Sequence, residues 1–170
     1  LVQEANSLCM SCHTNPTDSN CVHHPVKEMF EGTAFVTGID GIAGEHFKAK
    51  DGPVCMTCHM QQIPVGESTR ANHTFMPVLP GSADGKLSSA CEGCHKDLTM
   101  TDMQLLVQDT QASVRSRLKA AQTQFESLAK PQPNTEEMTR YEEVSSALNF
   151  VKNDGSLGIH NYNYADALLT

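Results

Sequence analysis

The sequence predicts a mainly α-helical chain with extensive irregular loops, closed by a pair of long antiparallel helices near the C-terminus. Three observations support this. Residues 101–170 are rich in helix formers and repeat apolar side chains at helical spacing. Residues 14–90 are punctuated by glycine and proline and show little periodicity. Only 5% of the 170 residues are aromatic and Trp is absent, so the polypeptide offers little bulky material for a conventional core.

The N-terminal part is expected to hold short helices followed by loops. We predict helices over residues 3–12 and 25–31, because Pro25 suits a first helical turn and Gly32 suits a helix end. Between Thr33 and Ala90 we expect little regular structure except turns.

The C-terminal part carries two apolar helical stripes. They consist of Val107, Val114, Leu118, Ala121, Phe125 and Leu128, and of Met138, Tyr141, Val144, Leu148 and Val151. The segment 130–134 breaks the first helix, and Asn134 with Glu137 forms a capping pattern for the second. The short linker predicts an antiparallel pair. A turn at 153–158 then leads to a last helix over about 160–169.

Charge and hydropathy exclude several classes of partner. The formal net charge is −8 and no cluster of Lys and Arg is visible, which disfavours nucleic acids and anionic membranes. No run reaches the roughly 18 to 20 apolar residues that span a bilayer. The sequence begins at Leu1 without a signal-peptide pattern, so we expect a soluble mature chain or a fragment of one.

Six of the seven cysteines form three copies of one pattern, C-x-x-C-H. The copies are Cys9-Met-Ser-Cys12-His13, Cys55-Met-Thr-Cys58-His59 and Cys91-Glu-Gly-Cys94-His95. This is the attachment signature of haem c. Two thiols on one short turn bind the two vinyl groups of a porphyrin, and the following His ligates the iron. We therefore expect three covalent haems, whose macrocycles replace the missing aromatic core.

Other interpretations of the cysteines fit less well. Structural zinc uses two C-x-x-C pairs per ion, which leaves three pairs unbalanced. Neither zinc nor a disulfide framework requires a His after every second Cys. A thioredoxin-like dithiol occurs once, near a strand–helix unit. Because haem c is attached outside the cytoplasm, we expect a periplasmic, cell-surface or extracellular protein.

Five histidines remain as candidate distal ligands: His23, His24, His46, His73 and His160. Five spare histidines beside three haems predict bis-His, low-spin, low-potential irons. Methionine is the alternative ligand, but Met10, Met56 and Met60 lie in or beside the motifs and are expected to pack on porphyrin faces.

The seventh cysteine, Cys21, lies in Cys21-Val22-His23-His24, which is not a C-x-x-C-H motif. Three interpretations stay open for it: a buried free thiol, a single-thioether attachment site for a fourth haem, and an intermolecular disulfide.

Residues 40–170 resemble the multihaem family of cytochrome c nitrite reductase and the octahaem hydroxylamine-oxidising and nitrite-reducing enzymes. The resemblance lies in the order of the second motif with Met60, then Asn72-His73-Thr74-Phe75, then the third motif, then long helices that end with Gly158-Ile159-His160-Asn161-Tyr162. It implies that the second haem takes its distal ligand from the terminal helical segment. The third haem takes its distal ligand from the loop between the motifs.

Carried over to this sequence, the resemblance pairs His59 with His160 and His95 with His73. It gives His13 no secure partner, and His24, His23 and His46 are candidates in that order. The resulting organisation is a triple-haem region over residues 1–100 and a helical hairpin with a terminal helix over 101–170. The resemblance also implies that a His can reach a haem in a neighbouring subunit.

The features in which this sequence departs from that family indicate which function to expect. Its nitrite reductases hold their catalytic haem through C-x-x-C-K, and that motif is absent here. We therefore expect an electron carrier with no catalytic residues, whose partners are redox proteins or extracellular acceptors. Homo-oligomers or head-to-tail filaments with haem-to-haem contacts extend this hypothesis.

The alternative is a fragment or subunit of a reductase acting on nitrite, hydroxylamine or a sulfur oxyanion. Its open iron would be that of His13, with His23, His24 or His46 as proton donor.

Overall fold

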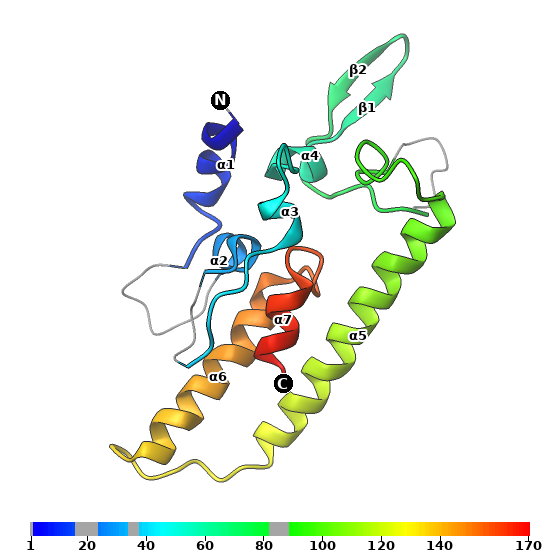
Figure 1. Ribbon diagram of the computed structural model, residues 1–170. Coiled ribbons are helices and arrows are strands. Elements are labelled where there is room, and N and C mark those ends of the chain that lie inside the picture. The colour runs from blue at the N-terminus through cyan, green and yellow to red at the C-terminus, as the bar shows by residue number, and fades with distance from the viewer. Residues whose placement is uncertain (1, 16–23, 34–37, 82–88) are drawn as a thin grey trace. The chain divides into compact units, whose positions relative to one another are not determined.

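The computed structural model describes residues 2–15, 24–33, 38–81 and 89–170. About half of the chain is helical, with irregular loops and little sheet (Figure 1). The helices are α1 (Val2–Met10), α2 (Val26–Glu31), α3 (Glu45–Lys48), α4 (Cys55–His59), α5 (Met100–Glu126), α6 (Glu136–Asp154) and α7 (Tyr162–Leu168). None of the helices in these ranges combines the length and apolarity needed to cross a membrane.

The chain divides into two compact units that alternate along the sequence. The first comprises residues 1–9 and 51–109, and the second comprises residues 10–50 and 110–170. The sequence predicts a different division at residue 100, between the region of the cysteine motifs and the long helices. That division stays a prediction.

The first unit contains a hairpin that the sequence pattern did not predict. Strands β1 (Gln62–Val65) and β2 (Ser68–Ala71) pair antiparallel, with Gln62 opposite Ala71 and Val65 opposite Ser68. Both strands are largely exposed, so they lack the apolar alternation by which a strand is recognised.

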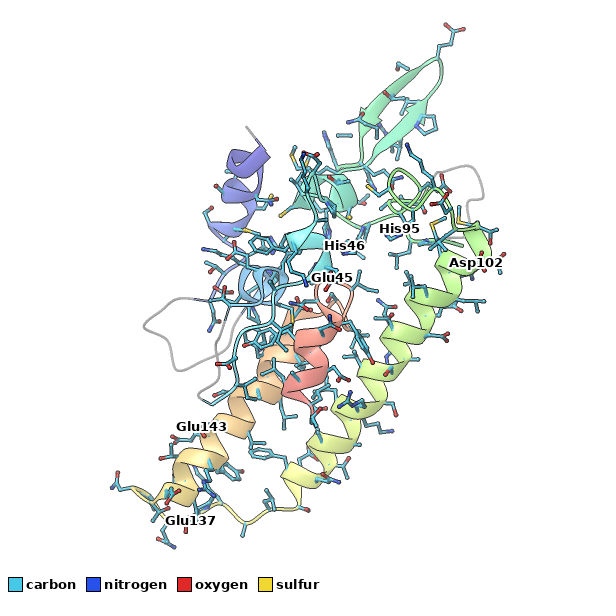
Figure 2. The ribbon with its side chains drawn as sticks, in the orientation of Figure 1. Glu45, His46, His95, Asp102, Glu137 and Glu143 are labelled. Carbon is cyan, nitrogen blue, oxygen red and sulfur yellow. The ribbon has the colours of Figure 1, made fainter. Side chains whose placement is uncertain are left out.

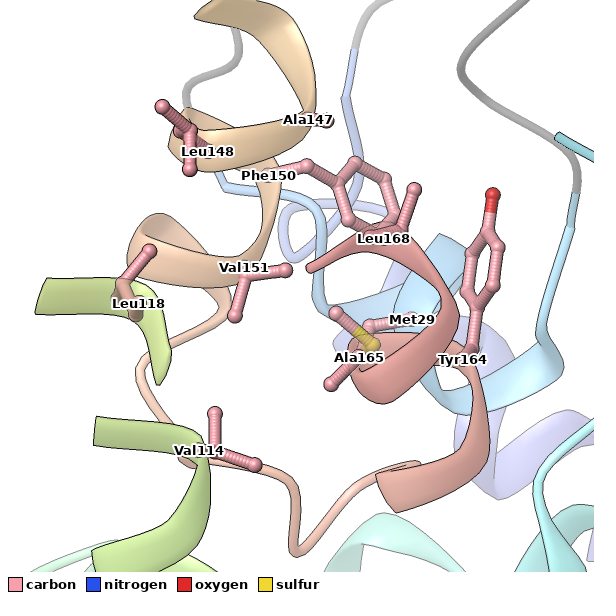
Figure 3. Close-up of a cluster of buried hydrophobic side chains, with 10 residues drawn as sticks. All are labelled: Met29, Val114, Leu118, Ala147, Leu148, Phe150, Val151, Tyr164, Ala165 and Leu168. Carbon is pink, nitrogen blue, oxygen red and sulfur yellow. The ribbon is translucent and has the colours of Figure 1, made fainter. Parts of the chain in front are cut away.

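The second unit has a continuous apolar core (Figure 3). It is formed by Met29 of α2, Val114 and Leu118 of α5, Ala147, Leu148, Phe150 and Val151 of α6, and Tyr164, Ala165 and Leu168 of α7. Four residues of the predicted stripes therefore lie in the core, whereas Leu128 and Val144 of the same stripes are exposed. The Phe125 and Tyr141 rings meet at 4.4 Å between centroids, near the linker.

Helix ends explain the observed boundaries. Helix α5 begins at Met100, well before the predicted stripe, because Thr99 and Asp102 cap it reciprocally: each backbone N–H donates to the other's side chain at 3.1 Å. Helix α6 is capped by Thr135, whose Oγ1 accepts from Met138 N at 3.1 Å. The predicted cap at Asn134 was wrong, because Asn134 has a φ of +63° whereas an N-cap requires extended backbone.

Candidate haem sites

The second motif occupies the one-turn helix α4. Its thiols, Cys55 and Cys58, are three residues apart and so lie on one side of the turn. Thr57 fixes the start of this turn, since its Oγ1 accepts from Val54 N at 3.1 Å. Cys55 N donates to Oδ1 of Asn6 in α1 at 2.9 Å, which anchors the motif within the first unit.

The other two motifs also lie on turns. In the third motif, the Cys94 and His95 N–H groups donate to the Cys91 carbonyl at 3.2 and 2.9 Å. The Cys91 N–H donates to Ser89 Oγ at 3.3 Å, which holds the start of the turn. In the first motif, Cys9 lies in the last turn of α1, and Cys12 and His13 follow in a turn.

The six motif cysteines are free thiols, and some from different motifs interact. Burial, followed by the neighbouring Cys9, raises the pKa of the Cys55 thiol to about 11. Burial, followed by Cys91 and Cys94, raises the pKa of Cys58, and burial raises the pKa of Cys91. Catalytic redox cysteines have depressed pKa values, so these raised values argue against a thioredoxin-like pair.

His59 is held by the loop that follows the hairpin. Its Nδ1 lies 2.8 Å from the Phe75 carbonyl oxygen, so Nδ1–H donates and Nε2 carries the lone pair of the ring. Asn72 builds that loop: its Oδ1 accepts from Thr74 N and Oγ1 at 3.0 and 2.9 Å, and its Nδ2 donates to the Met76 carbonyl at 3.2 Å.

His160 is held by a carboxylate. Its Nδ1 lies 2.6 Å from Asp154 Oδ1, and the Asp154 side chain is 1% exposed. Ser156 completes the arrangement, because its N and Oγ donate to Asp154 Oδ2 while its Oγ accepts from His160 N at 3.1 Å. The sequence indicated only a turn here. The missed signal is an acidic residue placed at the helix end, six residues before a candidate ligand.

The remaining candidate ligands differ in their surroundings. His24 lies beside His13: the ring centroids are 4.4 Å apart, and His24 Nε2 is 2.6 Å from His13 Nδ1. His46 on α3 and His95 after the third motif are exposed and are labelled in Figure 2. His73, in the Asn72 loop, is exposed as well. Cys21 and His23 lie outside the described residues.

The residues present fit haem c. Beside the free thiols of the first unit, large apolar side chains are left in solvent, with Phe75 60% and Met76 68% exposed. The Met56 side chain, inside the second motif, is 43% exposed. Clustered exposed apolar side chains are unusual unless a ligand covers them. A porphyrin attached to these thiols offers an apolar face of matching character, and the imidazoles supply nitrogen ligands for iron.

Comparison of the structure with solved structures identifies two similar cytochromes. One is the outer cell wall cytochrome OcwA, with a TM-score of 0.81 and 28% identity over 97% of this chain. The chain therefore has a cytochrome fold. The other is an undecahaem cytochrome from the S-layer of Carboxydothermus ferrireducens, with a TM-score of 0.65 and 23% identity over 98% of this chain.

The chain spans only part of each of these cytochromes: 33% of OcwA and 27% of the undecahaem protein. No protein-family model and no curated protein matches the sequence. The structural neighbours support the multihaem cytochrome interpretation, and they do not show the resemblance to the nitrite reductase family.

Proposed function

We propose that the chain is an electron-transfer cytochrome with three covalently attached c-type haems, each ligated by two histidines. The observation that carries this is the presence of three C-x-x-C-H turns with free thiols on a cytochrome fold. An iron with two histidine ligands gains and loses one electron without exchanging a ligand. The task of the chain is then to fix spacing, exclude water and tune the potentials.

The proposed ligand pairs are His59 with His160 and His95 with His73. They rest on the order of motifs that resembles the nitrite reductase family. The hydrogen bonds of His59 and His160 support the first pair, because both rings donate from Nδ1, and this is the tautomer that a ligand binding iron through Nε2 requires. For His13 we propose His24, which lies beside it.

The proposed array connects the three haems through neighbouring attachment points. Cys55 interacts with Cys9, and Cys58 interacts with Cys91 and Cys94. Thiols of the other two motifs thus contribute to the raised pKa values of the second motif. Attachment sites that interact in this way support porphyrins close enough to exchange electrons. In this proposal the haems organise the loops.

We place this cytochrome at the cell surface or outside the cell. The cell-wall and S-layer names of the two similar cytochromes support this location. Head-to-tail assembly of copies is part of the proposal, since a haem exposed at each end would let current pass between copies. Sedimentation and negative-stain microscopy of the holoprotein distinguish filaments from monomers.

Two measurements on the oxidised holoprotein test the function. Intact mass is expected to show three haems, and the double variant Cys91→Ala/Cys94→Ala is expected to carry two. Low-temperature EPR is expected to show low-spin bis-His signals only. A high-spin signal from an iron that binds cyanide or nitrite would overturn the carrier proposal and favour the reductase alternative, with its open site at His13.

A further inference from the structure

The C-terminal end of α6 carries a closed polar network around one candidate ligand. Asp154, the last residue of the helix, accepts from His160 Nδ1 through Oδ1 and from Ser156 through Oδ2. Ser156 Oγ accepts in turn from the His160 backbone N–H. Each of the three residues contacts the other two, so the imidazole has one orientation and one tautomer.

The backbone explains why this network forms. Gly155 ends α6 in the left-handed region with φ +73°, and Gly158 turns the chain again with φ +93°. A Cβ at Gly158 would lie 2.9 Å from Val114 Cγ2, so α5 passes close to this turn. Gln111 Nε2 of α5 donates to the Ser156 carbonyl at 3.2 Å, which fastens the turn to the helix. The turn brings residue 160 back onto residue 154.

We infer that Asp154 is a positioning residue that strengthens His160 as an electron donor to iron and lowers the reduction potential of the haem it ligates. The inference rests on the proposed role of His160 as a ligand. A carboxylate that accepts from Nδ1–H makes the imidazole more basic at Nε2 than a carbonyl does. His59 shows the contrast, since its Nδ1–H donates to the neutral Phe75 carbonyl at 2.8 Å.

Burial makes the carboxylate effective. Ferric iron carries one more positive charge than ferrous iron, so a basic ligand and a nearby negative charge both stabilise the ferric form. The Asp154 side chain is almost fully buried, and charge interactions inside a protein are screened far less than those in water. The two effects of Asp154 therefore have the same sign, and both lower the potential.

The experiment is spectroelectrochemical titration of the holoprotein and its Asp154→Asn variant, with EPR of the oxidised state. One midpoint potential is expected to move to a more positive value. Removing the hydrogen-bond partner of a metal-bound histidine commonly changes metal affinity about ten-fold or more. A ten-fold change in the ferric-to-ferrous ratio corresponds to ~59 mV for a one-electron couple. The g-values of one low-spin signal are expected to move as well.

Two further variants separate this effect from a general loss of structure. Glu136→Gln removes the same charge from an exposed side chain at the other end of α6 and is expected to leave all potentials unchanged. Ser156→Ala keeps the carboxylate and the backbone N–H donor of residue 156 but removes the hydroxyl donor, so Asp154 becomes a stronger acceptor for His160. That variant is expected to move the same potential to a more negative value. A merely structural role for the network does not produce shifts of opposite sign.

The variant His160→Met distinguishes the two levels of the proposal. If it changes one EPR signal while Asp154→Asn leaves every potential in place, the role of Asp154 is overturned and the ligand assignment stands. If His160→Met leaves all low-spin signals unchanged, His160 is not a ligand, and the assignment and the role of Asp154 both fall. If Asp154→Asn does not retain three haems, Ser156→Ala decides: no shift, or a positive shift, overturns the inference.

Discussion

Replacing Asn161 is expected to destabilise the second unit more than any exposed substitution does. The Asn161 side chain is 3% exposed and makes three hydrogen bonds. Nδ2 donates to the Met29 and Ile42 carbonyls at 3.0 and 2.6 Å, and Oδ1 caps α7 by accepting from Tyr164 N at 3.1 Å. One amide therefore joins α2, the loop before α3 and the start of α7.

The magnitude follows from these three bonds. In Asn161→Ala the lost cap costs ~1 kcal/mol. The Ile42 carbonyl, left without this donor, costs ~1–3 kcal/mol, and the lost bond to the Met29 carbonyl, which keeps the Gly32 N–H as a donor, costs ~0.5–1.5 kcal/mol. The expected loss is therefore ~2.5–5.5 kcal/mol, a large fraction of the ~5–15 kcal/mol that stabilises a typical domain. Asn161→Ser keeps an oxygen for the cap, but its shorter side chain offers one O–H in place of the two N–H donors of the amide, and its loss is expected to be ~1 kcal/mol smaller.

The assay is urea unfolding of the holoprotein, followed by circular dichroism at 222 nm and evaluated by linear extrapolation. Asn149→Ala, an exposed substitution on α6, is the matched control and is expected to change stability by no more than ~0.5 kcal/mol. A loss below ~1 kcal/mol in Asn161→Ala would refute the assigned role of this amide.

Three further predictions concern other parts of the chain. Gly32→Ala is expected to lower the free energy of unfolding by at least ~1–2 kcal/mol in the same urea assay. The reason is that Gly32 has a φ of +68° and that a Cβ would lie 1.9 Å from the Ile42 carbonyl oxygen. An unchanged free energy of unfolding would contradict this prediction. In the haem-free chain, burial raises the pKa of Cys55 from 9.0 to about 11, so the folded form holds this proton more tightly than the unfolded form. The resulting stability is complete below about pH 9 and lost as the pH rises towards 11, a loss that unfolding midpoints should record and Cys55→Ser should abolish. Arg117→Ala removes an ion pair with Asp166 and a hydrogen bond to Thr170 Oγ1. Because both charged side chains are more than a third exposed, thermal unfolding is expected to show a loss of stability of only ~0–1 kcal/mol. A larger loss would show that solvent screens this ion pair less than its exposure indicates.

The haem motifs were readable from the sequence because their chemistry is local. Two thiols and an imidazole within five residues need only one turn, and α4 supplies such a turn at Cys55–His59. The end of α2 at Gly32 was readable for the same reason, since a left-handed helix end favours glycine. The capping pair of Thr99 and Asp102 at the start of α5 is equally local, but it was not among the predictions.

The hydrogen-bond partners of the candidate ligands His59 and His160 were not readable, because they depend on tertiary structure. The Phe75 carbonyl reaches His59 only after the Asn72 loop has formed. Asp154 reaches His160 only after two glycines have reversed the chain. Pairings between motif histidines and distant histidines have the same character. Spacing along the chain carries no information about them, and a family resemblance was needed to propose them.

The alternating course of the second unit has a consequence for the order in which the chain folds. Its core joins Met29 near the N-terminus to Leu168 near the end of the described chain, so contacts of very high sequence separation complete it. Such contacts form late, because the cost of closing long loops precedes any gain from burial. The unit cannot become compact until residue 168 is available. Cys12 and His13 belong to this unit and therefore stay on an unpacked chain until then, whereas the second and third motifs belong to the first unit, whose residues end at 109.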